Sequence, residues 1–130
     1  MDTASVPTNI DVVRGFYEAV NDADLNRALT SLAPEIEVRT RVETYRGIDA
    51  VSQMLNERLA EWDSTVEIRE ILEPVPNTVV VSHHLVMRGL HTRMTVSDDL
   101  VDVIQLRDGL MRRTEVYSSL DEALASVLAP

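Results

Sequence analysis

The residues best suited to acid–base chemistry lie on segments of alternating apolar residues, and Asp102 is the first of them. Alternation along a strand would place Leu100, Asp102 and Ile104 on one face, so this carboxyl group has apolar neighbours on both sides. Such surroundings disfavour the ionised form of a carboxyl group, a property that a general acid working near neutral pH needs. A buried hydrogen bond to a helix, or a position on the other face, would explain the same pattern without chemistry.

His83 is the second candidate, because Val81, Leu85 and Met87 would share its strand face. Its imidazole could orient Asp102 or a substrate, and the alternative is a hydrogen-bonded core histidine. His84 would point to the opposite face. The sequence therefore indicates one carboxyl group and one imidazole that could act together.

The composition excludes several other kinds of chemistry. The 130 residues contain no cysteine, and every basic residue is arginine, which removes thiolate nucleophiles, Schiff-base lysines and the P-loop lysine. The formal net charge of −10 argues against a surface that neutralises a nucleic-acid backbone. The three histidines lack the spacing of a metal site, and there is no Gly-x-Ser-x-Gly elbow. We expect no metal, no cofactor, no nucleic-acid partner and no membrane segment.

The apolar spacing is helical in the first part of the chain and mostly alternating in the second. The predicted helices span Ile10 to Val20, Leu25 to Leu32 and Ile48 to Trp62, and Thr8 with Asp11 forms a capping box for the first. The predicted strands span Glu35 to Val42, Thr65 to Leu72, Thr78 to Arg88, Leu90 to Leu106 and Leu110 to Ser118, and a final short helix begins after Ser119.

The separators between the strands predict how the sheet is connected. Gly89 and Asp108-Gly109 are typical of tight hairpin turns, and Ser97-Asp98-Asp99 predicts a bulge or bend in the longest strand. Helices followed by a meander predict an α+β fold whose helices cover one face of a curved antiparallel sheet. We expect a single domain over residues 1–130, with residues 1–8 as a flexible leader.

Four segments carry a family resemblance when taken in order: Phe16 to Leu25, Leu32 to Val38, Tyr45 to Val51 and Asp102 to Gly109. They resemble the nuclear transport factor two-like superfamily, which includes ketosteroid isomerases, limonene epoxide hydrolases and SnoaL-like polyketide cyclases. The resemblance covers nearly the whole chain. It implies a cone, formed by a bent sheet wrapped around its helices, with an apolar pocket at the open end.

The resemblance to ketosteroid isomerases implies a site only in part. Their oxyanion-hole tyrosine, protonated aspartic acid and proton-transferring aspartate correspond to Phe16, Asp102 and Thr40. Only Asp102 matches, although Tyr17 lies one residue from the tyrosine position. Steroid isomerisation is therefore not expected.

The other two families also match unevenly. The aspartate, arginine and aspartate of limonene epoxide hydrolases correspond to His83, Leu85 and Val116, so the same epoxide chemistry is not expected. Gly89 to Thr92 resembles the Gly-x-His-Thr stretch of SnoaL-like cyclases, whose acid–base aspartate corresponds to Asp102. The longer loop with prolines that usually follows that histidine is absent, and this leaves the role of His91 open.

The leading hypothesis is a SnoaL-like enzyme that carries out cyclisation, isomerisation or dehydration on a hydrophobic carbonyl compound. Asp102 and His83 would be the catalytic residues, and the residues expected to bind substrate are Phe16, Tyr17, Val38, Thr40, Leu85, Met87, Ile104 and Val116. The alternative is a ligand-binding or interaction domain of the same fold without chemistry. We also expect a cytoplasmic homodimer, paired through an outward sheet face that carries Glu37, Arg39, Arg41, Arg113 and Glu115 near Val80 and Val101.

Overall fold

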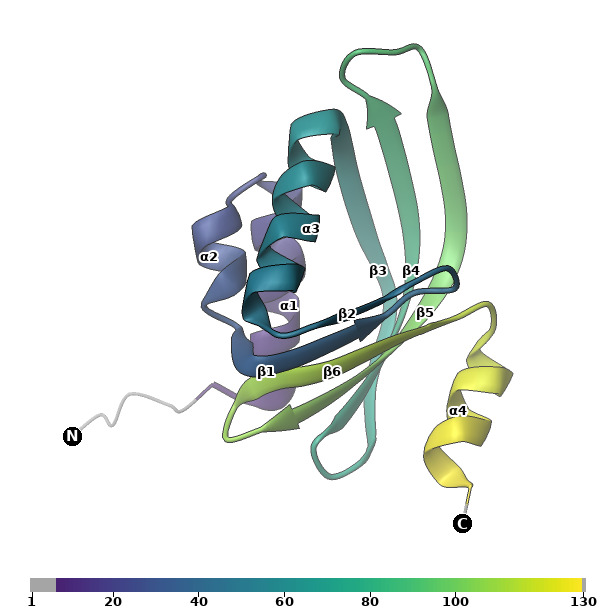
Figure 1. Cartoon of the computed structure of the whole chain (residues 1–130). Coiled ribbons are helices and arrows are strands. Elements are labelled where there is room, and N and C mark those ends of the chain that lie inside the picture. The colour runs from purple at the N-terminus through teal and green to yellow at the C-terminus, as the bar shows by residue number, and fades with distance from the viewer. Residues whose placement is uncertain (1–6, 130) are drawn as a thin grey trace, which may run out of the picture.

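Helices form the first part of the chain and long strands the second, as the apolar spacing predicts (Figure 1). The computed structural model describes residues 7–129, so the predicted leader lies outside the described residues except for Pro7 and Thr8. The elements are α1 (Asn9–Asn21), α2 (Leu25–Leu29), β1 (Leu32–Arg39), β2 (Thr44–Arg46), α3 (Ile48–Glu61), β3 (Trp62–Val75), β4 (Thr78–Gly89), β5 (Thr95–Arg107), β6 (Leu110–Tyr117) and α4 (Leu120–Leu128).

The strands form one bent, six-stranded sheet in the order β2-β1-β6-β5-β4-β3. Neighbouring strands are antiparallel except for β1 and β6, which are parallel, so the predicted antiparallel sheet is in fact mixed. The strands β3, β4 and β5 run together, and β1, β2 and β6 cross the lower end of the sheet in Figure 1. This bend gives the sheet a concave inner face.

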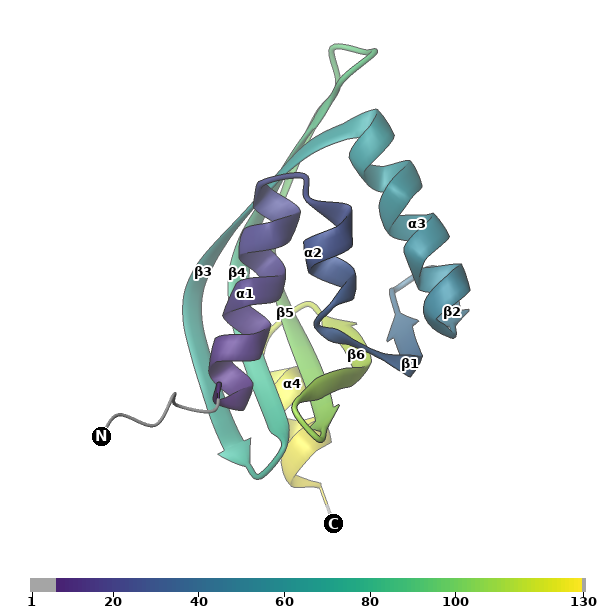
Figure 2. The same ribbon diagram turned by 90° about the vertical axis from the view of Figure 1, so that its left-hand side faces the viewer.

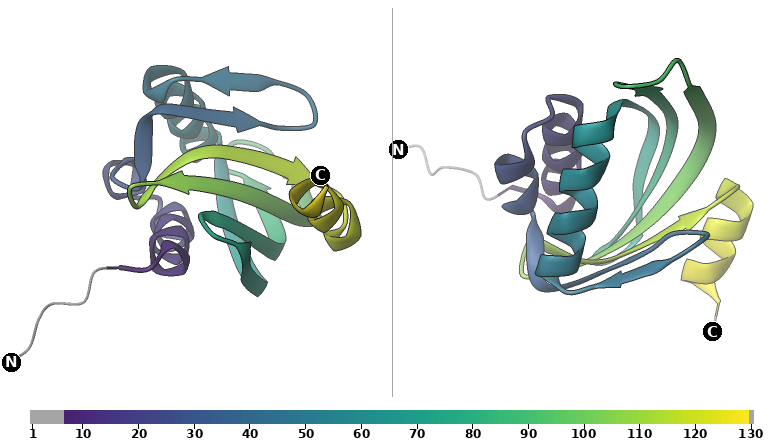
Figure 3. Two further views of the ribbon diagram at one scale, coloured as in Figure 1. Left: turned by 90° about the horizontal axis from the view of Figure 1, so that it is seen from below. Right: turned by 45° about the horizontal axis from the view of Figure 1, so that its top comes forward.

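Three helices cover the inner face and one covers the outer face. Figure 2 shows α1, α2 and α3 in front of the sheet, with α4 behind it, and Figure 3 shows the same division from two further directions. The main core lies between α1, α3 and the sheet, whereas α4 packs on Val80, Val101 and Val103 from outside. The expectation that the helices cover only one face was therefore wrong, because the apolar side of α4 needs its own partner surface.

The predicted capping box at the start of α1 is confirmed. The Thr8 hydroxyl accepts a hydrogen bond from the backbone N–H of Asp11 at 3.1 Å, and the Asp11 carboxylate accepts one from the N–H of Thr8 at 3.1 Å. The second helix ends at Leu29, earlier than predicted, because β1 begins at Leu32 and includes Pro34. The pairing of β1 with β6 shifts register between Leu32 and Glu37, where the missing N–H of proline can be accommodated.

The tight turn at Gly89 and the bulge at Ser97 to Asp99, one of the two alternatives predicted there, do not occur in the long hairpin. Gly89 does not form a tight turn, since β4 ends there and β5 begins at Thr95, which leaves a five-residue loop. No bulge interrupts β5 at Ser97 to Asp99, because its pairing with β4 is continuous from Thr78 opposite Gln105 to Arg88 opposite Thr95. Asp98 pairs with Arg41 at 3.0 Å, and Asp99 lies 2.8 Å from Nδ1 of His84, so both acidic side chains have partners on other segments of the chain.

Other connections follow the sequence more closely. Asp108 and Gly109 form the predicted tight turn, with φ angles of 53° and 75° that favour Asp and Gly. The three-residue strand β2 was not predicted, because an element so short has no measurable period. The resulting fold places Asp102 on β5 and His83 on β4 on the inner face of the sheet, where Tyr17 on α1 contacts Asp102.

Candidate active site

Asp102, His83 and Tyr17 form a buried hydrogen-bond network between α1 and the sheet. The Tyr17 hydroxyl donates to Oδ2 of Asp102, and Nε2 of His83 lies 3.0 Å from the same oxygen. All three residues are more than nine-tenths buried. The second oxygen, Oδ1, has no hydrogen-bond partner among residues 7–129, yet it is not sealed from ligands. The network therefore holds one side of the carboxyl group and leaves the other free.

The hydrogen bonds define the roles of the three groups. As a carboxylate, Asp102 accepts hydrogen bonds from both neighbours, with the Nε2–H of His83 as one donor. Burial raises the pKa of Tyr17 well above its ordinary value, and the negative charge of Asp102 and the hydrogen bond to it raise it further. Tyr17 therefore remains a protonated donor. Nδ1 of His83 is buried with no hydrogen-bond partner in the described part of the chain.

A small apolar cavity of about 70 Å³ lies beside Asp102. It is lined by Phe16, Tyr17, Leu32, Ile36, Val38, Val51, Met54, Leu55, Asp102, Met111 and Thr114. Apart from Tyr17 and Asp102, the only polar side chain in this lining is that of Thr114, whose residue is buried. A substrate in this cavity would therefore meet one carboxyl group among mostly apolar side chains.

The predicted site residues fall into three groups in the structure. Asp102, Phe16, Tyr17 and Val38 line the cavity, and His83 contacts Asp102. Ile104 is completely buried in the core, and Leu85 packs against that core. Met87 and Val116 are half-buried and are not among the lining residues, and Thr40 is exposed where its hydroxyl accepts and donates hydrogen bonds with Glu43.

Tyr17, rather than Phe16, contacts the catalytic candidate on β5. The resemblance to ketosteroid isomerases had assigned Phe16 to the tyrosine position, one residue away. The rings of the two residues meet edge to face with centroids 5.6 Å apart, so both face the same region. Because adjacent residues on a helix differ in direction by about 100°, only the contacts made in the folded chain decide which of them reaches Asp102.

The sequence analysis did not identify the α3 residues that complete the site. Val51, Met54 and Leu55 line the cavity, and Arg58 lies on the same helical face one turn later. The Arg58 Nε–H donates to the hydroxyl of Ser64 at 3.4 Å. The helical spacing from Val51 to Arg58 was the available signal, but it is equally typical of an ordinary helix surface.

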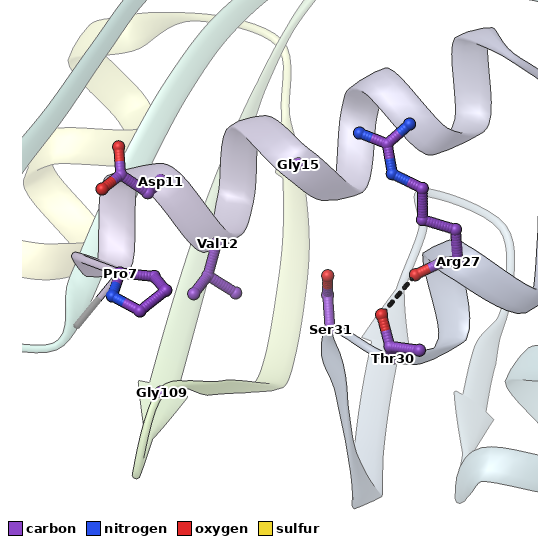
Figure 4. A pocket seen from close by; sticks show the side chains of 8 residues that line it. All are labelled: Pro7, Asp11, Val12, Gly15, Arg27, Thr30, Ser31 and Gly109. Carbon is purple, nitrogen blue, oxygen red and sulfur yellow. Dashed lines mark hydrogen bonds between the residues drawn. The ribbon is translucent and has the colours of Figure 1, made fainter. Parts of the chain in front are cut away.

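A larger hollow of about 270 Å³ lies away from this network, between α1, α2 and the β5–β6 turn (Figure 4). Its charged residues are already engaged elsewhere. Asp11 caps α1, and Arg27 pairs with Glu18 at 3.1 Å and with Asp22 at 3.3 Å. Thr30 donates to the carbonyl of Arg27 at 2.6 Å. No free acid or base faces this hollow, so it is not the candidate active site.

Two further features concern metals and membranes. Among residues 7–129, no three histidine, aspartate or glutamate side chains are grouped as a metal site would require. In the same part of the chain, every helix is too short or too polar to cross a membrane.

Solved structures with the same fold are numerous, although their sequences differ widely from this one. A cystatin-fold protein from Novosphingobium aromaticivorans is 16% identical, with a TM-score of 0.77 over 85% of this chain and 97% of that one. A putative polyketide cyclase from Xanthomonas campestris is 20% identical, with a TM-score of 0.73 over 92% and 96%. A limonene epoxide hydrolase-like enzyme from M. tuberculosis is 16% identical, with a TM-score of 0.77 over 92% and 89%. These similarities confirm the predicted cystatin-like, nuclear transport factor two-like fold.

Sequence comparison identifies the family more directly. A search of curated proteins found no match. The family model of the SnoaL-like domain, however, matches residues 13–114, which include most of α1, all of α2 and α3, most of the sheet and Asp102. The predicted resemblance is thereby confirmed, and the chain belongs to the family of SnoaL-like domains.

Proposed function

We propose that the protein is a cofactor-independent acid–base enzyme acting on a hydrophobic carbonyl compound, with Asp102 as the group that moves the proton. One observation carries the proposal. Tyr17 and His83 both bind Oδ2 of Asp102, while Oδ1, beside an apolar cavity, has no partner among residues 7–129. A purely structural carboxylate in the core would be expected to have both oxygens satisfied.

The proposed reaction begins with proton transfer from carbon. Oδ1 of Asp102 takes a proton from the carbon next to the substrate carbonyl, and the electrons of the C–H bond move to the carbonyl oxygen, giving an enolate. The enolate can then regain the proton at another carbon, expel a leaving group or attack a second carbonyl. These outcomes correspond to isomerisation, dehydration and cyclisation. Tyr17 and His83 act here as positioning residues that hold the carboxylate.

The family membership supports this class of chemistry. The chain has the fold of a putative polyketide cyclase and of an epoxide hydrolase-like enzyme, and the charged residues expected for epoxide opening are replaced at Leu85 and Val116. Carbonyl chemistry requires a base beside an apolar pocket, which the surroundings of Asp102 provide.

A ligand-binding domain without chemistry is the second candidate, and the small cavity favours it. A volume of about 70 Å³ holds only a small group unless the walls move apart. In that case the hydrogen bonds from Tyr17 and His83 to Asp102 would stabilise the fold and have no role in catalysis.

Exchange of hydrogen for deuterium in cyclohexanone distinguishes the two candidates without knowledge of the natural substrate. The protein is mixed with cyclohexanone in deuterium oxide, and loss of the signal from the carbon-bound protons beside the carbonyl is followed by NMR. The enzyme hypothesis predicts faster exchange than in buffer, and loss of that acceleration in Asp102→Asn. Binding of cyclohexanone without any acceleration would instead favour the ligand-binding domain.

A homodimer remains a proposal, and the structure changes which surface we propose for it. Val80 and Val101 are covered by α4, so they are not available for pairing. Glu37, Arg39 and Arg113 remain partly exposed on the outer face and alternate in charge, which suits pairing with a second copy. Analytical ultracentrifugation tests this, and a monomer at all concentrations would contradict it. The expected cytoplasmic location likewise stays a prediction, which cell fractionation would test.

A further inference from the structure

The hydrogen bonds around Asp102 leave the proposed enolate without a donor from the network itself. A tyrosine hydroxyl has one hydrogen, and that of Tyr17 is directed at Oδ2 of Asp102. The Nε2–H of His83 is directed at the same oxygen. Neither group can donate to a substrate oxygen while it holds the carboxylate. A negative oxygen formed in the cavity therefore needs a hydrogen-bond donor from another element.

Arg58 on α3 is the candidate for that donor, since it follows lining residues of the cavity on the same helix without itself being one of them. It follows the cavity-lining residues Leu55 by three positions and Met54 by four, so all three share one face of the helix. Side chains on an α-helix lean toward its N-terminus, which directs Arg58 back over the turn that contains Met54 and Leu55. The rise between Leu55 and Arg58 is about 4.5 Å, which is within the length of an arginine side chain.

The guanidinium group of Arg58 is anchored at one nitrogen and free at the other two. Its Nε–H donates to Oγ of the buried Ser64 at 3.4 Å. Its terminal NH2 groups have no acceptor among residues 7–129, and they are not sealed from ligands. No carboxylate in that part of the chain lies within ion-pair distance of Arg58, although the protein is strongly acidic.

The electrostatics of the cavity agree with this placement. Desolvation by burial lowers the pKa of the Arg58 guanidinium, and the negative charge of Asp102 acts in the opposite direction. The same arginine acts on Tyr17 in the opposite direction, lowering a pKa that burial raises. A desolvated cation with free N–H groups interacts strongly with a negative charge that forms nearby.

We propose that Arg58 is a further catalytic residue, whose terminal N–H groups bind the carbonyl oxygen of the substrate and stabilise the enolate. This inference deepens the proposed function and rests on it for the identity of the reaction. When Oδ1 of Asp102 takes the proton, Asp102 becomes neutral and the negative charge moves to the substrate oxygen. Arg58 retains its charge throughout and offsets the negative charge at both stages. The substrates this favours are enolisable ketones, not compounds whose reacting group stays neutral.

A phenolate that resembles an enolate tests the inference without turnover. The probe is para-nitrophenol, whose ionised and neutral forms are distinguished by absorbance, and the background is Asp102→Asn, which imitates the carboxyl group after proton transfer. Replacing Arg58 by Gln in that background is expected to weaken phenolate binding at least about tenfold, since a hydrogen bond to a charged group is lost. Binding of the neutral probe should change by less than about threefold.

Controls separate binding of the anion from general damage. Arg14→Gln removes an exposed arginine of α1 and should leave phenolate binding unchanged. Arg58→Lys keeps the charge and should retain part of the preference for the phenolate, so it also serves if Arg58→Gln does not fold. Thr114→Val tests the neutral hydroxyl in the cavity lining, and an effect there larger than at Arg58 would overturn the inference.

The inference and the proposed function can fail separately. Equal losses for phenolate and neutral phenol in Arg58→Gln, or no loss for either, would exclude Arg58 as the enolate donor. Cyclohexanone exchange that survives in Asp102→Asn would exclude Asp102 as the base and leave the result for Arg58 intact. If exchange is lost in Asp102→Asn but phenolate binding does not depend on Arg58, the role of Asp102 as the base is supported and the inference about Arg58 is excluded.

Discussion

The inner and outer faces of the same sheet surround a carboxylate with different partners. On the inner face, Asp102 accepts hydrogen bonds from Tyr17 and His83 and keeps one oxygen free beside an apolar cavity. On the outer face, Glu37 lies 3.0 Å from Arg39, 3.3 Å from Arg46 and 3.8 Å from Arg113. Each environment stabilises a negative charge, but only the inner one leaves a lone pair for chemistry.

The pKa of Glu37 shows what the outer arrangement does. Desolvation opposes ionisation, but the attraction of Arg39, Arg46 and Arg113 outweighs it and lowers the pKa of Glu37 below its usual 4.5. A carboxylate surrounded by cations in this way is a poor proton acceptor. The comparison teaches that a reactive carboxylate is defined by an unshared oxygen and a dry neighbourhood, and not by the number of charges around it.

The largest expected effect separates the two carboxylates directly. Asp102→Asn should slow the exchange of cyclohexanone protons by at least about a hundredfold, because general acid–base catalysis typically contributes that much. Glu37→Gln, its matched control on the outer face, should change the rate by less than about twofold. NMR in deuterium oxide measures both. Equal losses in the two variants would mean that the difference between the faces has no chemical consequence.

A second prediction compares two tyrosines that each donate to a carboxylate. Tyr17→Phe should lower the free energy of unfolding by about 1–3 kcal/mol, because the buried Asp102 loses a donor. Tyr45→Phe removes a hydrogen bond of 2.6 Å to the exposed Glu43 and should change the stability little. Urea unfolding followed by circular dichroism measures the two. The contrast fails if the exposed pair contributes as much as the buried one.

Neighbouring histidines allow a third comparison of smaller expected size. His83→Gln should lower the stability by about 1–2 kcal/mol, since a buried bond of 3.0 Å to Asp102 is replaced by a poorer one. His84 lies 2.8 Å from Asp99 on the exposed side, so His84→Gln should have a much smaller effect. Both are read from urea unfolding curves. A larger loss at His84 would contradict the assignment of His83 to the network.

The smallest effect concerns alkaline pH. Because the pKa of Tyr17 is raised in the folded state, its contribution to stability is complete below the ordinary tyrosine value of 10.0. As the pH rises above that value, the unfolded chain loses the phenolic proton while the folded chain keeps it. The free energy of unfolding therefore decreases until the pH reaches the pKa of Tyr17 in the folded state. Unfolding curves between about pH 9 and pH 11 should show this loss in the wild type and less of it in Tyr17→Phe. Identical slopes would show that Tyr17 titrates normally.

Much of the fold and part of the site could be predicted from local patterns. The alternation around Asp102 and His83 predicted apolar neighbours on the same strand face for both, and it left open which face of the sheet Asp102 would occupy. The structure places both side chains on the inner face. The capping box of α1 and the tight turn at Asp108 follow from chemistry within a few residues. The loop after Gly89 could not be predicted from such patterns, because it depends on where β4 and β5 stop pairing.

The sequence by itself determined the family, the order of the elements other than β2 and the two groups that could move a proton. Only the tertiary structure decided that Tyr17 donates to Asp102, that α4 covers the outer face and that Arg58 contacts Ser64 through Nε. The physical reason is the sequence separation over which each kind of interaction acts. Periodicity and capping act between residues a few positions apart, whereas the contact of Tyr17 with Asp102 joins residues 85 positions apart and exists only after the sheet has bent around α1.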